Sequence, residues 1–128
     1  MADEHGRYPC PCCGYLDFDE GPGSYDICPI CFWEDDLSQL RFAYMGGGAN
    51  RVSLLEGQRF YGALGACEAR FVTQVRPPTG EDQRDAGWRP LNPTSDNIED
   101  ADAVPNSAQT YPEDTTTLYY WRDTYWRR

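Results

Sequence analysis

Two short stretches decide the fold of this chain: Cys10-Pro11-Cys12-Cys13-Gly14 and Cys28-Pro29-Ile30-Cys31. Each places two thiols at C-x-x-C spacing, at which a tight turn brings the second thiolate back to the metal ion held by the first. Pro11 and Pro29 favour that turn because they fix φ, and Gly14 can take a positive φ at its exit. The outer cysteines of the two knuckles therefore predict one shared metal site, with the ligands Cys10, Cys13, Cys28 and Cys31.

A site of four thiolates leaves no coordination position for water or substrate, which is typical of a structural zinc centre. We therefore expect Zn²⁺, with iron as the alternative. Six cysteines in 128 residues are too few for a disulfide scaffold. The first residues form no apolar leader and no stretch has the length of a membrane helix, so we expect a cytoplasmic protein. In that reducing compartment a cysteine cluster indicates a metal site.

Two cysteines and the only histidine remain outside the predicted site. Cys12 has two interpretations: a reactive thiol held near the metal, or a spare thiol that points away from it. We expect the second, because C-x-C and C-C spacings are less usual for ligands. Cys67 has no paired cysteine nearby and is expected to be a small buried or capping thiol. His5 is expected to be a bystander, since four cysteines already complete the site.

The rest of the chain predicts a small α+β fold. Residues 15–19 alternate between apolar and polar and predict a strand. A turn should follow, and residues 25–27 should return to the second knuckle, which gives a zinc-ribbon or rubredoxin-like metal hairpin. Two short helices should follow. Ser53 and Glu56 fit a capping box for the first, which Gly65 would end, and residues 71–75 would form the second. The β-branched and aromatic run 115–121 predicts a C-terminal β-strand.

Four segments, taken in order, resemble the bacterial cysteine-rich CPCC family. They are YPCPCCGY (8–15), SYDICPICFWEDD (24–36), GGANRVSL (47–54) and VRPP (75–78). The resemblance covers a little over half of the chain and implies a small cytosolic bacterial protein without a settled activity. It places the metal role on the same four cysteines. The first knuckle also resembles rubredoxin, but Phe32 stands where rubredoxin has glycine, which weakens the case for iron electron transfer.

The chain accordingly divides into three predicted parts. Residues 8–78 form a metal-binding domain of CPCC type. Residues 79–110 form an extended acidic, Pro-rich arm or linker, with Trp88 and Leu91 as its evident anchors. Residues 111–128 form the aromatic segment that would carry the C-terminal strand.

The charge and the missing catalytic groups suggest what the protein does. The formal net charge is −10, and a field of that sign repels nucleic acid and anionic lipid. We see no Ser-His-Asp set, no Cys-His pair beyond the lone histidine and no phosphate loop, so we do not expect an enzyme. The leading hypothesis is a zinc-stabilised protein-interaction module, for example an inhibitor or immunity protein for a basic bacterial toxin. The predicted contact with a basic protein partner is Trp33, Glu34, Asp35 and Asp36. Its aromatic anchor would be Trp33, or Trp121 and Trp126 of the C-terminal segment.

Other interpretations stay open. The three carboxylates of that contact also fit a solvated turn or a helix start. A rubredoxin-like or thiol redox protein is the second hypothesis for function. A nucleic-acid-binding ribbon is the third, and only Arg122, Arg127 and Arg128 could give it a basic face. The sequence leaves the oligomeric state open.

Overall fold

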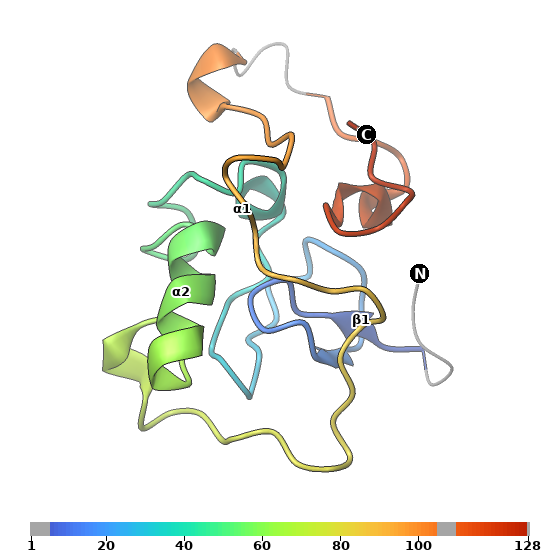
Figure 1. The fold of residues 1–128 in the computed structure, drawn as a ribbon. Coiled ribbons are helices and arrows are strands. Elements are labelled where there is room, and N and C mark those ends of the chain that lie inside the picture. Colours follow the sequence, from blue (N-terminus) through green and yellow to red (C-terminus); the bar gives the residue numbers. More distant parts are fainter. Residues whose placement is uncertain (1–5, 105–109, 128) are drawn as a thin grey trace.

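The computed structural model describes residues 6–104 and 110–127, so His5 and Arg128 lie outside the described residues. The fold is small and α+β, as predicted, with a two-stranded sheet, two α-helices and short 3-10 turns (Figure 1). In chain order the elements are β1 (Tyr8–Pro9), β2 (Leu16–Phe18), α1 (Leu37–Arg41), α2 (Leu54–Leu64), η1 (Ala69–Phe71), η2 (Ala101–Ala103) and η4 (Thr115–Leu118).

The sheet encloses the first knuckle. β1 pairs antiparallel with β2, with Tyr8 opposite Phe18 and Pro9 opposite Leu16. The predicted strand is therefore present, but its partner precedes the first knuckle, whereas we expected residues 25–27. Ile27 instead makes an isolated antiparallel bridge to Glu34, across the second knuckle. Each knuckle is thus closed by its own flanking residues.

Both α-helices begin at side-chain caps. The Asp36 carboxylate caps α1 by accepting hydrogen bonds from the N–H groups of Ser38 (2.8 Å) and Gln39 (3.3 Å). This supports the interpretation of the acidic run as a helix start. For α2 the predicted capping box is confirmed, since the Ser53 hydroxyl accepts from the Glu56 N–H at 3.1 Å and the Glu56 carboxylate accepts from the Ser53 N–H at 3.0 Å.

The end of α2 and the segment after it differ in how well they match the prediction. Gly65 ends α2 in the left-handed conformation, with φ of 78°, as predicted. The expected second helix is reduced to the 3-10 turn η1, which ends at Phe71. Val72 and Val75, which we placed in that helix, are β-branched and lose side-chain freedom in a helix.

The predicted C-terminal strand is wrong. Residues 115–118 form η4, which begins where the Asp114 carboxylate accepts the Thr116 N–H at 3.0 Å. Of the aromatic residues that follow, Tyr120 and Trp121 are in a turn, and Tyr119 and Tyr120 are buried. Their rings enter the core directly and the backbone adds no strand to a sheet. The β-propensity of this run comes from bulky side chains that are stabilised by burial. The core buries them here without a strand.

Helix α2 and the aromatic segment 118–125 flank the knuckles, as Figure 1 shows in green and red. One buried side chain joins the two: the Gln58 amide donates to the Pro11 carbonyl (3.0 Å) and to the Tyr120 hydroxyl (2.9 Å). α2 can approach the first knuckle closely because residue 57 is glycine: a Cβ at this position would lie 3.3 Å from Cys12 Sγ.

The acidic arm lies against the first knuckle over residues 83–91. The Gln83 carbonyl accepts the Leu16 N–H at 2.8 Å, and Arg84 Nε donates to the Cys13 carbonyl at 3.0 Å. Trp88, one of the two predicted anchors, donates its indole N–H to the Pro11 carbonyl at 3.1 Å. Leu91, the other, is buried. The arm therefore contributes directly to the cover of the metal site.

Candidate metal centre

The structure brings Cys10, Cys13, Cys28 and Cys31 together. Their four Sγ atoms lie within 4.8 Å of one another, and all four residues have 0% exposure. The distance between Cys10 Sγ and Cys31 Sγ is 3.5 Å, and that between Cys13 Sγ and Cys28 Sγ is 3.7 Å. A tetrahedron with zinc–sulfur bonds of about 2.3 Å has edges of about 3.8 Å. The sulfurs are therefore positioned to hold one tetrahedral metal ion.

The two knuckles have the same backbone hydrogen bonds. After the first, the Gly14 N–H donates to the Cys10 carbonyl at 2.7 Å, and after the second, the Phe32 N–H donates to the Cys28 carbonyl at 2.8 Å. The first cysteine of each knuckle also donates its own N–H, Cys10 to the Tyr15 carbonyl and Cys28 to the Trp33 carbonyl, both at 2.9 Å. Two copies of one local structure therefore face each other across the sulfurs.

Backbone donors also point at a sulfur of the cluster. The N–H groups of Ile30 and Cys31 both donate to Cys28 Sγ at 3.4 Å. A sulfur that accepts such bonds is stabilised as a thiolate, which is the form that binds metal. Burial raises the pKa of the Cys10 and Cys31 thiols well above their usual value. Without metal these two thiols keep their protons, so metal binding must release protons.

Asp17 is a neighbour of the cluster that the sequence did not indicate. Its Oδ2 lies 2.9 Å from Cys28 Sγ, and its buried Oδ1 has no hydrogen-bond partner within residues 6–104 and 110–127. Burial, together with the charge of Cys28, raises the pKa of Asp17 to about 9. The available signal was the strand alternation, because Leu16 and Phe18 are buried on one face and Asp17 occupies the other.

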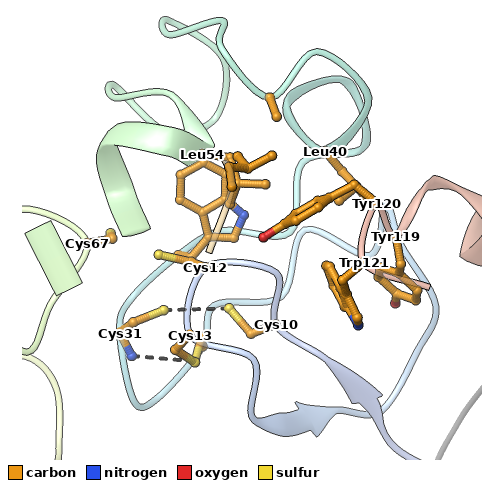
Figure 2. Packing of buried hydrophobic residues seen from close by; sticks show 14 of the residues in the cluster. Cys10, Cys12, Cys13, Cys31, Leu40, Leu54, Cys67, Tyr119, Tyr120 and Trp121 are labelled. Carbon is orange, nitrogen blue, oxygen red and sulfur yellow. Dashed lines mark hydrogen bonds between the residues drawn. The ribbon is translucent and has the colours of Figure 1, made fainter. Parts of the chain in front are cut away.

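The remaining two cysteines are not among the four converging sulfurs. Cys12 lies on the side of the cluster that faces Leu54, and Cys67 lies farther out on the side away from Tyr119 and Trp121 (Figure 2). Both residues are fully buried. Burial raises the pKa of the Cys12 thiol and of the Cys67 thiol. Neither environment favours a reactive thiolate, which needs access and a lowered pKa.

The predicted partner contact is mostly part of the folded interior. Trp33 is fully buried, so its side chain does not reach the surface as the anchor that we expected. The buried Asp35 carboxylate accepts hydrogen bonds from the Ser24 N–H at 3.2 Å and the Ser24 hydroxyl at 2.8 Å. Asp36 is buried as the cap of α1. Only Glu34 keeps a partly exposed side chain.

The arginines of the nucleic-acid alternative make contacts within the protein. Arg122 Nε donates to Asp85 Oδ2 at 2.9 Å. Arg127 donates to the Asn97 carbonyl at 3.1 Å and to Asn97 Oδ1 at 2.8 Å. Within the described ranges, these two residues bind acidic and amide groups of the chain itself, and Arg128 lies outside those ranges.

The fold and the site together define a small α+β protein with a buried four-cysteine centre that could bind a metal ion. The chain belongs to the cysteine-rich CPCC family, whose model matches residues 8–82. A comparison with curated proteins gives no match. Leu91 and the aromatic segment 118–125 lie beyond the matched region, yet they contribute buried residues to the same core. In the described part of the chain, no helix combines the length and the apolarity needed to cross a membrane.

Proposed function

We propose that the metal is zinc, that its role is structural, and that the protein is an acidic interaction module for a basic protein partner. One observation supports the structural role above all. The four ligand residues have 0% exposure and each supplies one sulfur, which completes a tetrahedral shell. A catalytic centre needs an open coordination position that a substrate can reach, and a shell of this kind offers none.

The charge of the chain supports a basic partner. The formal net charge is −10 before any contribution from the metal centre. Two further negative charges are expected when four thiolates hold one Zn²⁺. Such a field speeds the encounter with a basic protein and discourages acidic competitors. An inhibitor or immunity protein for a basic toxin such as a nuclease is the form of this function that we propose. A reducing cytoplasm, in which the thiols stay available to the metal, belongs to the same proposal.

The surface around Glu34 is the proposed first contact. Two large side chains are exposed beside it: Tyr25 is 51% exposed and Ile27 is 48% exposed. Ile27 is paired with Glu34 in the antiparallel bridge, and the Tyr25 N–H donates to the Asp35 carbonyl at 3.1 Å. An aromatic ring and an aliphatic side chain next to a carboxylate combine the anchoring and the charge that a protein interface uses. Tyr25 therefore replaces the buried Trp33 as the proposed aromatic anchor.

The test begins with the protein purified from its natural host without added metal. Metal analysis should give one zinc per chain. The zinc-loaded protein is then used to capture partners, and association with a captured protein is measured at two salt concentrations. We expect a basic partner whose association slows at high salt. Glu34→Gln should slow association more than Glu81→Gln, which removes one carboxylate from the exposed arm. An acidic partner, or an association rate indifferent to salt, would exclude this mechanism.

An iron-bearing redox protein remains the second candidate, because one observation favours it. Phe32, which departs from the rubredoxin pattern in sequence, takes the backbone conformation that glycine would take there, with φ of 72°. The knuckle therefore keeps its shape despite the substitution. An iron–thiolate protein is red and a zinc protein is colourless. Visible absorption of the protein as isolated, together with iron analysis, decides between the two.

A further inference from the structure

A pocket of about 360 Å³ lies between the segment that follows α1 and the turn η2. In Figure 1, η2 is the orange turn above α1. Phe42, Met45 and Ile98 supply apolar lining, and Tyr44, which is 39% exposed, adds an aromatic ring. Glu99, Asp100 and Asp102 add three carboxylates to the same lining. The volume of the pocket is at the lower end of the range for small-ligand sites, about 300–1,000 Å³. It can admit one extended side chain.

The three carboxylates are not equivalent. Glu99 is held by Arg41, whose Nε and Nη2 donate to its two oxygens at 2.9 and 3.2 Å. The side chains of this ion pair are only 4% and 9% exposed. Asp100 and Asp102 are exposed, and among residues 6–104 and 110–127 the structure gives neither of them an ion pair. Two carboxylates without a counter-charge therefore stand beside an apolar pocket.

The same structure already binds one arginine in surroundings of this kind. The Arg41 guanidinium lies over the rings of Phe42 (4.8 Å), Tyr111 (4.7 Å) and Trp126 (4.9 Å), and it is paired with Glu99. Aromatic faces and a carboxylate are together favourable for a guanidinium, because it is planar, weakly hydrated and always charged. The pocket offers a second set of these groups in Tyr44, Asp100 and Asp102, in this case at the surface.

We propose that this pocket receives an arginine side chain of the basic partner. The proposal rests on the proposed function, since it names the side chain that such a partner presents. The aliphatic stem lies on Ile98 and Met45, and the guanidinium reaches Asp100 and Asp102 beside the Tyr44 ring. Arginine is preferred over lysine because its fork can bond two carboxylate oxygens at once and can stack on a ring.

The experiment uses the zinc-loaded full chain and a peptide of nine arginines as the probe. Binding is measured by calorimetry at low salt, and the contact is located by amide chemical shifts in NMR spectra. We expect the largest shifts at residues 44–45 and 98–102. Combining Asp100→Asn with Asp102→Asn should weaken binding about tenfold. Asparagine still caps η2, so the turn is kept.

A charge-matched control separates the pocket from general attraction. Combining Asp19→Asn with Glu20→Gln removes the same charge from exposed positions after β2 and should weaken binding less than about threefold. Equal losses in the two double variants, largest shifts outside the pocket, or no measurable binding of the peptide would each overturn the proposal. A peptide of nine lysines that binds equally well would overturn arginine as the occupant. Shifts that gather around Glu34 would reject the pocket and leave the proposed function standing. An acidic natural partner would reject the proposed function itself.

Discussion

Phe32 has the same left-handed backbone conformation as Gly14, at the equivalent position of the other cysteine knuckle. The φ angles are 72° at Phe32 and 83° at Gly14. This conformation costs a residue with a Cβ about 1–2 kcal/mol, and glycine avoids the cost. The Phe32 ring packs against the Phe71 ring, with ring centroids 4.3 Å apart. A ring contact of this kind contributes about 0.5–1.5 kcal/mol beyond burial, so it offsets much of the backbone strain.

Two substitutions at Phe32 separate strain from ring contact. Phe32→Ala loses the ring and keeps the strained φ, whereas Phe32→Gly loses the ring and relieves the strain. We expect the glycine variant to be the more stable of the two by about 1 kcal/mol. Urea unfolding of the zinc-loaded proteins measures the difference. Phe71→Ala should destabilise the native protein but change little in the Phe32→Ala background. An alanine variant at least as stable as the glycine variant would contradict the backbone argument.

Metal content should depend on four cysteines and not on the other two. Cys10→Ser and Cys31→Ser each remove a converging sulfur, and we expect them to lose the metal or bind it far more weakly. Cys12→Ser and Cys67→Ser alter thiols outside the cluster and should keep one metal per chain. Structural zinc contributes roughly 10–16 kcal/mol in small peptides, against about 5–15 kcal/mol of net stability for a whole domain. The first two variants should therefore also lose cooperative unfolding. Release of metal by Cys12→Ser would show that the ligand set is wrong.

Asp35 should make the protein less stable as the pH rises. Burial raises the pKa of Asp35 to about 6, above the value near 3.9 of an unfolded aspartate. Between these values the folded state binds more protons than the unfolded state, so the stability from this group is present below about pH 4 and lost through pH 6. Asp35→Asn removes that loss. From pH 5 to pH 7.5, its free energy of unfolding relative to the native protein should rise by on the order of 1 kcal/mol. A difference that stays constant with pH would contradict the assignment.

Gln58 should contribute more to stability than its exposed neighbour Arg59. Its amide donates to the Pro11 carbonyl and the Tyr120 hydroxyl, and its Oε1 accepts the Leu91 N–H at 2.7 Å. Gln58→Leu leaves the buried Leu91 N–H without a partner, at a cost of about 1–3 kcal/mol. The Pro11 carbonyl keeps its bond from Trp88 and the Tyr120 hydroxyl keeps its bond to the Arg89 carbonyl, so each of these loses only one of two bonds. We expect a total loss of about 2–3 kcal/mol in the free energy of unfolding. Arg59→Leu, one position along α2, should change it by less than about 0.5 kcal/mol.

The local parts of the fold could be predicted from sequence because their signals are local. The cysteine spacing identified the four sulfurs, and the Ser53–Glu56 pair fixed the start of α2. In both cases a few neighbouring residues determine the geometry through turn and capping chemistry. Gly14 belongs to the same group, since a positive φ was expected at the knuckle exit.

The long-range parts could not be predicted, because no neighbouring residue encodes them. The run 115–121 has strand propensity, but its rings are buried against knuckles about a hundred positions earlier in the chain. Trp33 was expected in the partner contact beside the acidic residues 34–36, yet it is fully buried and would lie 3.2 Å from a Cβ at Gly57. The contact between Asp17 and Cys28 of the cluster depends on the pairing of β1 with β2. Tertiary packing decided each of these outcomes.

The cover over the four sulfurs has a consequence for how the site would acquire a metal ion. Helix α2, the arm at residues 83–91 and the segment 118–125 all lie against the knuckles, and the ligand residues have 0% exposure. Once these segments have closed, an ion leaves only when the molecule opens, so its residence time is set by the unfolding rate. An ion taken up while the chain folds would therefore be kinetically trapped. The metal found in the site would then reflect the supply at the moment of folding, whatever the equilibrium affinities of zinc and iron for the same four thiolates.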